Sequence, residues 1–224
     1  MTVRTPSISA AMEDYLKTIQ QIAEASGGAP VQTQALSDRL GVSTASVTGM
    51  IKKLDLYRLV EHEPYHGVVL TPRGELVALE VLRHHRLLEL YLVEQLGMSW
   101  EDVHAEADRL EHVISEGLEE RIAAALGQPE RDPHGDPIPA LDGTVPSDPW
   151  QRLADVPPGA HVEILRVSDR DPRLLQYLAE RGLTPGVTAQ VDAVDELAGV
   201  ITLTVKSGAC TLALTTAGEI TVRA

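Results

Sequence analysis

Four side chains within nine residues could bind a metal ion together: His104, Asp108, Glu111 and His112. At 100° per residue they would lie at about 0°, 40°, −20° and 80° around a helix, so all four share one face. Imidazole nitrogens and carboxylate oxygens are common ligands of divalent metal ions. Acidic helices are also frequent on protein surfaces, and a histidine on a helix usually binds no metal. The spacing alone therefore leaves both interpretations open.

A second pair of such residues precedes this stretch. His85 and Glu89 are four residues apart, so they also share one face of a helix. On neighbouring antiparallel helices, the two groups together would form a divalent metal site with nitrogen and oxygen donors.

Clusters of this kind also build metal-dependent enzymes such as di-metal oxidases and hydrolases. The sequence has no Glu-x-x-His pair repeated on separate helices, because Glu111 and His112 are adjacent. It also has no Gly-rich phosphate loop, Ser nucleophile elbow or His-Glu-x-x-His motif. We therefore expect a protein that is not an enzyme. A metal-dependent enzyme or a metal-storage protein is the alternative from another class.

Three helices and a β-hairpin are predicted before residue 72. Apolar residues recur at helical spacing in 7–25, in 31–40 and in a third segment that begins at Ser43 or Thr44, and a short hairpin follows at 59–70. This order is typical of a winged helix-turn-helix, whose third helix enters the DNA major groove. A helix-turn-helix can also be a protein scaffold only. Hydroxyl and basic residues that suit DNA contact lie on the third helix: Ser43, Thr44, Ser46, Thr48, Lys52 and Lys53.

The rest of the chain is predicted to contain two long helices, a linker and a small β-barrel-like domain. Thr71-Pro72 opens a helix to about residue 96, and Ser99 caps another to about residue 126. The first of these helices is apolar on more than one side, which favours burial in a symmetric homodimer. Residues 127–158 are rich in Pro, Gly and Asp and are expected to form a linker. After it, strands are expected at 161–167, 187–194, 200–206 and 211–222, with one helix at 173–181.

The formal net charge of −14 is unusual for a DNA-binding protein, but it is unevenly distributed. Residues 1–72 carry six Lys and Arg against seven Asp and Glu, whereas the remainder carries 13 against 26. An acidic body that repels DNA until cations bind fits a metal-triggered DNA-binding protein, although an acidic surface also simply favours solubility. No apolar run reaches the ~20 residues of a membrane span and no signal-peptide core is present, so we expect a cytoplasmic location. Cys210 is the only cysteine, which excludes disulfides and thiolate zinc clusters.

Several stretches resemble one protein family, and they occur in that family's order: Glu13-Asp14-Tyr15-Leu16, Ser43 to Leu54, Thr71-Pro72-Arg73-Gly74, Arg83 to Glu89, His104 to His112, His134 to Pro139, and Leu174 to Gly186. The family is the diphtheria-toxin-repressor family of iron- and manganese-dependent regulators, and the resemblance covers essentially the whole chain. It implies a homodimer that binds double-stranded operator DNA when it is loaded with metal.

The resemblance also implies a mainly α fold with a small β domain. A winged helix-turn-helix DNA-binding domain is expected at 1–72, and a helical dimerisation and metal-binding domain at 73–145. An SH3-like barrel, shared with ferrous-iron transport accessory proteins, is expected at 146–224.

Two metal sites are implied by the same resemblance. The primary, activating site matches Asp14, Asp108, Glu111 and His112. The ancillary site matches three further residues, His85, Glu89 and His104. Candidates to complete the ancillary site from the linker or the third domain are Asp132, His134 and Asp169.

The sequence departs from iron-responsive members, which have Met and Cys at the positions of Asp14 and Asp108. Carboxylates are hard oxygen donors that suit Mn(II), whereas sulfur suits softer metals. Lys17 stands where manganese-responsive members often have Glu, so their two-metal site is not expected unchanged, and Gly49 stands where many members have a polar recognition-helix residue.

The carboxylates of Asp14 and Asp108 favour the manganese-responsive branch, and the resemblance then implies a Mn(II)-activated, homodimeric repressor of metal-uptake genes. An Fe(II)-responsive regulator is the alternative within the family, and Co(II), Zn(II) or Cd(II) could bind in vitro. Neither a membrane nor a small-molecule substrate is expected as a partner. In the expected mechanism, metal joins Asp14 of the DNA-binding domain to Asp108, Glu111 and His112 of the dimerisation domain, and so fixes the spacing of the two DNA-binding domains.

Overall fold

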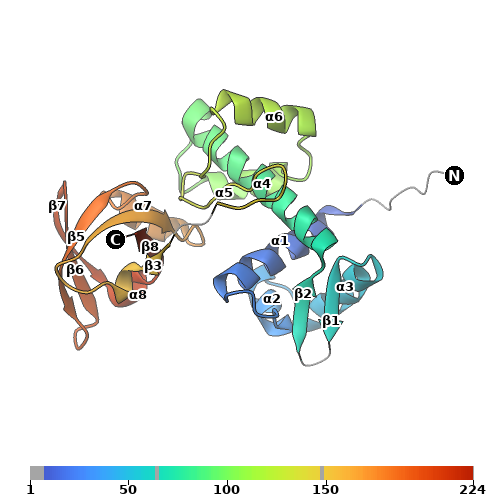
Figure 1. Cartoon of the computed structure of the whole chain (residues 1–224), viewed down its shortest axis with the longest axis horizontal. Coiled ribbons are helices and arrows are strands. Elements are labelled where there is room, and N and C mark those ends of the chain that lie inside the picture. The colour runs from blue at the N-terminus through green and yellow to red at the C-terminus, as the bar shows by residue number, and fades with distance from the viewer. Residues whose placement is uncertain (1–7, 64–65, 147–148, 224) are drawn as a thin grey trace. The chain divides into compact units, whose positions relative to one another are not determined.

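The computed structural model describes residues 8–63, 66–146 and 149–223. The chain divides into two compact units, Met1–His84 with Pro139–Thr144, and His85–Ile138 with Val145–Ala224 (Figure 1). Helix α4 (Pro72–Leu96) contributes residues to both units. Among the described residues, no helix combines the length and the apolar composition needed to cross a membrane.

The first unit is a winged helix-turn-helix, as the sequence predicts. Its elements before α4 are α1 (Ala10–Ala25), α2 (Thr33–Leu40), α3 (Thr44–Leu56), β1 (Val60–Glu63) and β2 (Gly67–Leu70). The two strands pair antiparallel, and Val31 forms a β-bridge with Val68 of the hairpin. Leu16, Leu36 and Ile51 are fully buried between the three helices. The turn expected around Pro64 lies partly outside the described residues.

The turn between α2 and α3 follows from local chemistry. Gly41 ends α2 in the left-handed conformation, with φ +66°, which glycine adopts without strain. Ser43 then caps α3, because its Oγ accepts the amide of Ser46 at 3.2 Å. These two residues separate the helices and fix where the recognition helix begins.

The helical part of the second unit corrects one prediction. The sequence suggested a single helix from Ser99 to about residue 126, whereas the structure has α5 (Val103–Leu110) and α6 (Glu116–Ala125). Residues 99–102 form a turn in which Ser99 Oγ donates to Asp102. After α5, the amides of Val113 and Ile114 both donate to the carbonyl of Leu110, and extended Ser115 precedes α6. Apolar periodicity continues across this break, which is why the pattern did not reveal it.

The C-terminal part of the second unit is the expected small SH3-like β domain. Its elements are β3 (Gln151–Arg152), η1 (Leu153–Asp155), β4 (His161–Val167), α7 (Pro172–Ala179), β5 (Thr188–Asp195), β6 (Val200–Val205), β7 (Gly208–Ala213), α8 (Leu214–Ala217) and β8 (Ile220–Arg223). One antiparallel sheet has the order β3-β8-β4-β5-β6-β7. The predicted strand at 211–222 is wrong, because the short helix α8 interrupts it and lets the chain return as β8 beside β4.

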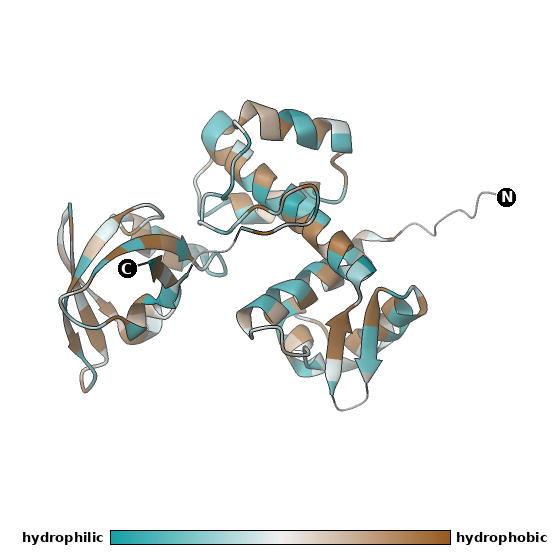
Figure 2. Ribbon diagram, in the orientation of Figure 1, coloured by the Kyte–Doolittle hydropathy of each residue, from teal (hydrophilic) through white to brown (hydrophobic). Residues whose placement is uncertain are grey.

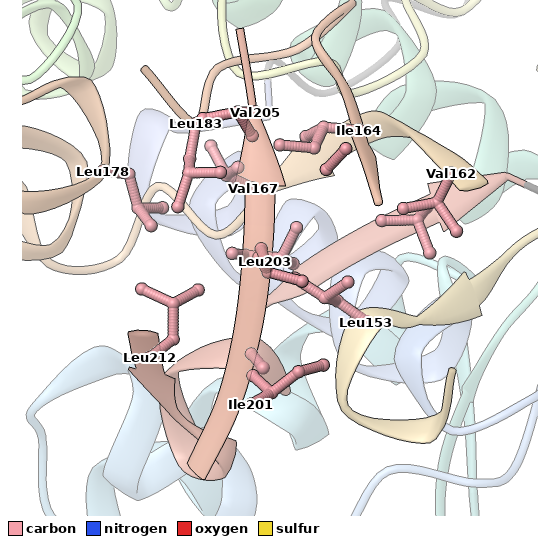
Figure 3. Packing of buried hydrophobic residues seen from close by; sticks show 14 of the residues in the cluster. Leu153, Val162, Ile164, Val167, Leu178, Leu183, Ile201, Leu203, Val205 and Leu212 are labelled. Carbon is pink, nitrogen blue, oxygen red and sulfur yellow. The ribbon is translucent and has the colours of Figure 1, made fainter. Parts of the chain in front are cut away.

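Alternating burial along these strands forms the core of the barrel. Ile164 of β4, Leu203 of β6 and Leu212 of β7 are buried together with Leu178 of α7 (Figure 3). The hydropathy colouring shows hydrophobic and hydrophilic residues alternating along helices and strands, as amphipathic elements around a core require (Figure 2).

Candidate metal centre

Four side chains from three segments of the second unit converge on one carboxylate. His85 and Glu89 lie one turn apart on α4, His104 lies on α5, and Asp169 follows β4. Glu89 Oε1 is 2.9 Å from His85 Nε2 and 3.0 Å from His104 Nδ1. Asp169 Oδ2 is 3.3 Å from the same nitrogen of His104. One ligand atom from each of the four residues lies within 4.8 Å of the others, so this group could hold one metal ion.

The second oxygen of Glu89 faces a further group. Glu89, Asp132 and His134 offer ligand atoms within 4.8 Å of one another, and all three residues are buried. His134 Nδ1 is 3.7 Å from Glu89 Oε2, which is too long for a hydrogen bond. Among the described residues, neither atom has a hydrogen-bond partner. A buried carboxylate oxygen and a buried imidazole nitrogen without hydrogen bonds destabilise the fold, and a cation bound between them would offset that free-energy cost. The residues therefore fit a divalent metal ion.

The orientation of His134 is fixed from its other side. Its Nε2 donates a hydrogen bond to the backbone carbonyl of Trp100 at 2.7 Å, and the two rings stack 5.6 Å apart. Because Nε2 carries that proton, Nδ1 is the nitrogen presented to Glu89. Metal-binding histidines are commonly oriented by such a hydrogen bond from the second ring nitrogen.

The loop that carries Asp132 and His134 is held against β4 of the barrel. Asp132 Oδ1 accepts the amides of His134 and Asp136, both at 2.9 Å. The carbonyl of His134 accepts the amide of Val167 at 2.9 Å. Gly135 has φ +91°, and a Cβ there would lie 1.9 Å from the carbonyl oxygen of Leu165. Only glycine therefore allows this close approach.

The carboxylates and imidazoles of the cluster shift one another's pKa values so that both kinds of group are charged. Burial alone would lower the pKa of His104, but Asp169 and Glu89 raise it to about 10. In the same way, burial disfavours charge on His134, but Glu89 and Asp132 raise its pKa to about 9. Burial raises the pKa of Asp169, and the neighbouring His104 more than offsets this, so its pKa falls to about 2. At neutral pH the two imidazoles thus carry the positive charge that a metal ion would otherwise supply.

Of the residues expected in the primary site, three meet in the second unit. His85 Nδ1 is 2.5 Å from Glu111 Oε2 and 3.3 Å from Asp108 Oδ1. His112 Nε2 is 3.5 Å from Glu111 Oε1, and the Glu111 side chain is fully buried. Asp14, the fourth expected ligand, lies on α1 in the first unit. Its role as a ligand stays a prediction.

The residues expected to contact DNA lie on α3 or cap it. Ser43, Ser46, Lys52 and Lys53 are exposed. The hydroxyls of Ser43 and Ser46 are 2.9 Å apart and hydrogen-bonded, and Thr48 donates to the carbonyl of Thr44. The two lysines are therefore the long cationic side chains available to phosphates on this helix.

Sequence reasoning missed the residues that orient the cluster. The Trp100 carbonyl is a backbone group, which no residue type reveals. The side chains of Arg86 and Arg166 bind the loop at Pro137 and Asp136, but these residues lie far apart in the sequence, and their spacing does not show that they meet. Two of the stretches that resemble the family contain such residues: Arg83 to Glu89 contains Arg86, and His134 to Pro139 contains Gly135 and Asp136.

Comparisons with known proteins agree with this architecture. Residues 7–68 match the iron dependent repressor N-terminal DNA binding domain, residues 71–140 match the iron dependent repressor metal binding and dimerisation domain, and residues 151–224 match the FeoA domain. The iron-dependent repressor IdeR of Mycobacterium leprae (strain TN) is 33% identical over 193 residues, which cover 80% of this chain and 83% of that protein.

Two solved structures are similar over nearly the whole chain. A manganese-dependent transcriptional repressor in complex with manganese is 40% identical, with a TM-score of 0.87 and coverage of 94% of this chain and 98% of that one. ScaR with bound Zn2+ is 31% identical, with a TM-score of 0.80 and coverage of 95% and 98%.

The fold and these matches define a metal-dependent DNA-binding transcriptional repressor, which is not an enzyme. The chain belongs to the family of metal-dependent repressors that includes IdeR and the diphtheria toxin repressor. Its DNA-binding and dimerisation domains imply operator DNA and a second copy of the chain as partners.

Proposed function

We propose that this chain is a Mn(II)-activated, homodimeric repressor of metal-uptake genes. The observation that carries the proposal is the ligand chemistry around Glu89. Every candidate ligand atom there is an imidazole nitrogen or a carboxylate oxygen: His85, Glu89, His104, Asp132, His134 and Asp169. The three carboxylates are hard oxygen donors that suit Mn(II), and the named set contains no sulfur ligand that would favour a softer metal. The similarity to a repressor solved with manganese supports the same metal.

Fe(II) is the second candidate, because iron-dependent repressors are among the curated relatives. Fe(II) binds a given nitrogen and oxygen site more tightly than Mn(II) in the general order of affinities. The two metals are distinguished by operator binding at controlled free concentrations of each metal, with Fe(II) kept under anaerobic conditions. Half-maximal DNA binding by Mn(II) at micromolar free metal, together with lower maximal DNA binding by Fe(II), supports the manganese regulator. The reverse result supports the iron regulator.

Exposed apolar side chains support a homodimer. Leu76 and Leu96 on α4, Val113 after α5 and Leu118 on α6 are each at least half exposed. Large apolar groups exposed on the helices of a dimerisation domain are the type of surface that a second copy covers. We propose that these helices form the dimer interface.

The proposed switch uses the two metal-ligand groups differently. Asp108 lies on α5, and Glu111 and His112 follow directly in the turn after it, whereas Asp14 belongs to the DNA-binding unit. A bound divalent cation supplies the positive charge that lets these carboxylates lie together. Asp14 then restrains the DNA-binding domain relative to the dimerisation domain. Shifting such an equilibrium from mostly inactive to mostly active needs about 5 kcal/mol of differential binding, which one metal site can supply.

The group around Glu89 would then stabilise the active form from within the second unit. His104, Asp169, Asp132 and His134 come from three segments of that unit, and Glu89 joins them. The test is Asp108→Ala compared with His134→Ala. We expect Asp108→Ala to abolish metal-dependent DNA binding with the fold intact, and His134→Ala to weaken metal binding. Full Mn(II)-dependent DNA binding by Asp108→Ala would refute the assignment of the primary site, and unchanged Mn(II) binding by His134→Ala would refute the assignment of the site around Glu89.

A further inference from the structure

Asp136 lies between two arginines that come from different parts of the second unit. Its Oδ1 is 3.0 Å from Arg166 Nη1 of β4 and 3.7 Å from Arg86 Nη2 of α4. Its side chain is 18% exposed and is outside the groups that could ligate a metal. We propose that Asp136 is a positioning residue, which holds the Asp132 and His134 ligands in place by joining their loop to α4 and to the barrel. This inference rests on the proposed metal site around Glu89.

Arg86 binds the loop from the helix side. Its Nη1 donates to the carbonyl of Pro137 at 2.6 Å, and its Nε is 3.9 Å from Asp132 Oδ2. The Arg86 side chain is only 6% exposed. It lies one residue after His85 and one turn before Glu89. A buried guanidinium needs such partners, because an unpaired buried charge is strongly destabilising.

Arg166 binds the loop from the barrel side. Its guanidinium reaches Asp136 from β4 and lies 5.9 Å from the centre of the Trp150 ring. β4 also holds the loop backbone, because Val167 donates to the carbonyl of His134. A side-chain contact at Asp136 and a backbone contact at His134 therefore both attach the loop to β4.

Asp136 is also hydrogen-bonded directly to the ligand residue Asp132 through its backbone. Its amide donates to Asp132 Oδ1 at 2.9 Å, and its carbonyl accepts the amide of Asp132 at 3.0 Å. Oδ1 of Asp132 thus accepts two backbone amides, and Oδ2, which lies 3.9 Å from Arg86 Nε, is the oxygen that would bind a metal ion. Loss of the charge on Asp136 would weaken its ion pairs with Arg166 and Arg86, and so loosen the attachment of the loop that carries Asp132 and His134 to β4 and α4.

The inference is tested with the full-length protein and the variant Asp136→Asn, which keeps the size of the side chain and removes its charge. Binding is measured with Mn(II) alone, by the electron paramagnetic resonance signal of free Mn(II). Residues that orient metal ligands typically contribute 10- to 100-fold to affinity, so we expect a loss of about that size. Asp142→Asn is the control, because it makes the same change at an exposed carboxylate of the linker. It should bind Mn(II) like the unchanged protein.

A spectroscopic measurement separates positioning from mere stability. With Co(II) alone at saturation, Asp136→Asn should alter the d–d absorption bands, because the ligand geometry changes. Arg166→Gln should have the same effect, and Arg166→Lys should recover most of the affinity and the spectrum by keeping the positive charge. Unchanged Mn(II) affinity and an unchanged Co(II) spectrum in Asp136→Asn would overturn the inference.

His134→Ala distinguishes the two possible failures. If this variant loses Mn(II) binding while Asp136→Asn retains it, the metal site stands and the positioning role is wrong. If His134→Ala also binds Mn(II) unchanged, the proposed site itself is wrong, and the inference about Asp136 is wrong with it.

Discussion

Glu89 Oε2 and His134 Nδ1 face each other across 3.7 Å in the interior of the second unit, and both side chains are fully buried. The other oxygen of Glu89 contacts His85 and His104. One carboxylate is therefore shared between a group of ligands on the helices and a group on the linker loop. Burial raises the pKa of Glu89, but the surrounding His85, His104 and His134 outweigh it and hold that pKa well below its ordinary range. Glu89 stays ionised and available to a cation.

Neutralising this carboxylate should remove metal binding from both groups. We expect Glu89→Gln, which keeps the shape of the side chain, to weaken Mn(II) binding by about 100-fold or more, because a shared charged ligand is lost. The measurement is a Mn(II) titration of the purified protein. Glu94→Gln, an exposed position on the same helix, is the matched control and should bind normally. Equal affinity in the two variants would contradict a role for Glu89.

Metal binding should release protons. His104 and His134, with pKa values of about 10 and about 9, are protonated at pH 7 before metal binds. Because a ligating imidazole nitrogen must lose its proton, Mn(II) affinity should rise between pH 7 and about pH 9, with release of about two protons at pH 7. Calorimetry in buffers of different ionisation enthalpy measures this number. An affinity that does not change over this range would argue against both histidines as ligands.

The same histidines should make the stability of the metal-free protein depend on pH. Their folded pKa values lie above the unfolded value of about 6.5. Their contribution to stability is therefore fully present below about pH 6.5, and it is lost as pH rises through about 9 to 10. Urea unfolding of metal-free protein at pH 6, 8 and 10 tests the sign. Greater stability at pH 10 than at pH 6 would contradict the prediction.

The close approach of Gly135 to β4 should make it intolerant of a side chain. We expect Gly135→Ala to destabilise the second unit by about 2–4 kcal/mol, because the new Cβ would meet the carbonyl of Leu165. Gly159→Ala is the control, since Gly159 also has positive φ but a Cβ there would meet open space. It should cost about 1 kcal/mol. Denaturant unfolding compares the two, and equal losses would show that the contact with Leu165 is unimportant.

Lys52 and Lys53 should contribute phosphate contacts. Each change to Ala should weaken DNA binding similarly for all sequences and reduce the slope of log K against log salt by about 1. Lys206→Ala in the barrel is the matched control, with no expected effect. Operator binding measured at several salt concentrations gives the slopes. Unchanged slopes would mean that neither lysine contacts a phosphate.

The sequence predicted the elements whose signals are local. Gly41 and Ser43 mark the helix-turn-helix, and the spacing of His85 with Glu89 places both on one helix face. It failed where tertiary structure overrides a continuous pattern, as at Ser115 between α5 and α6, and at the short helix α8 within a predicted strand. Spacing could not show that the loop around His134 meets Glu89, because that contact depends on Gly135 packing against β4.

The central claim is that Mn(II) controls operator recognition. It is tested most directly by capture of DNA from a random duplex library by metal-free protein, with and without Mn(II), at one near-physiological salt concentration. We predict enrichment of a single palindromic sequence only with Mn(II), because a homodimer presents two recognition helices to paired half-sites. Equal enrichment without metal would show that the clusters around Glu89 and Glu111 do not control DNA binding, and would contradict the account.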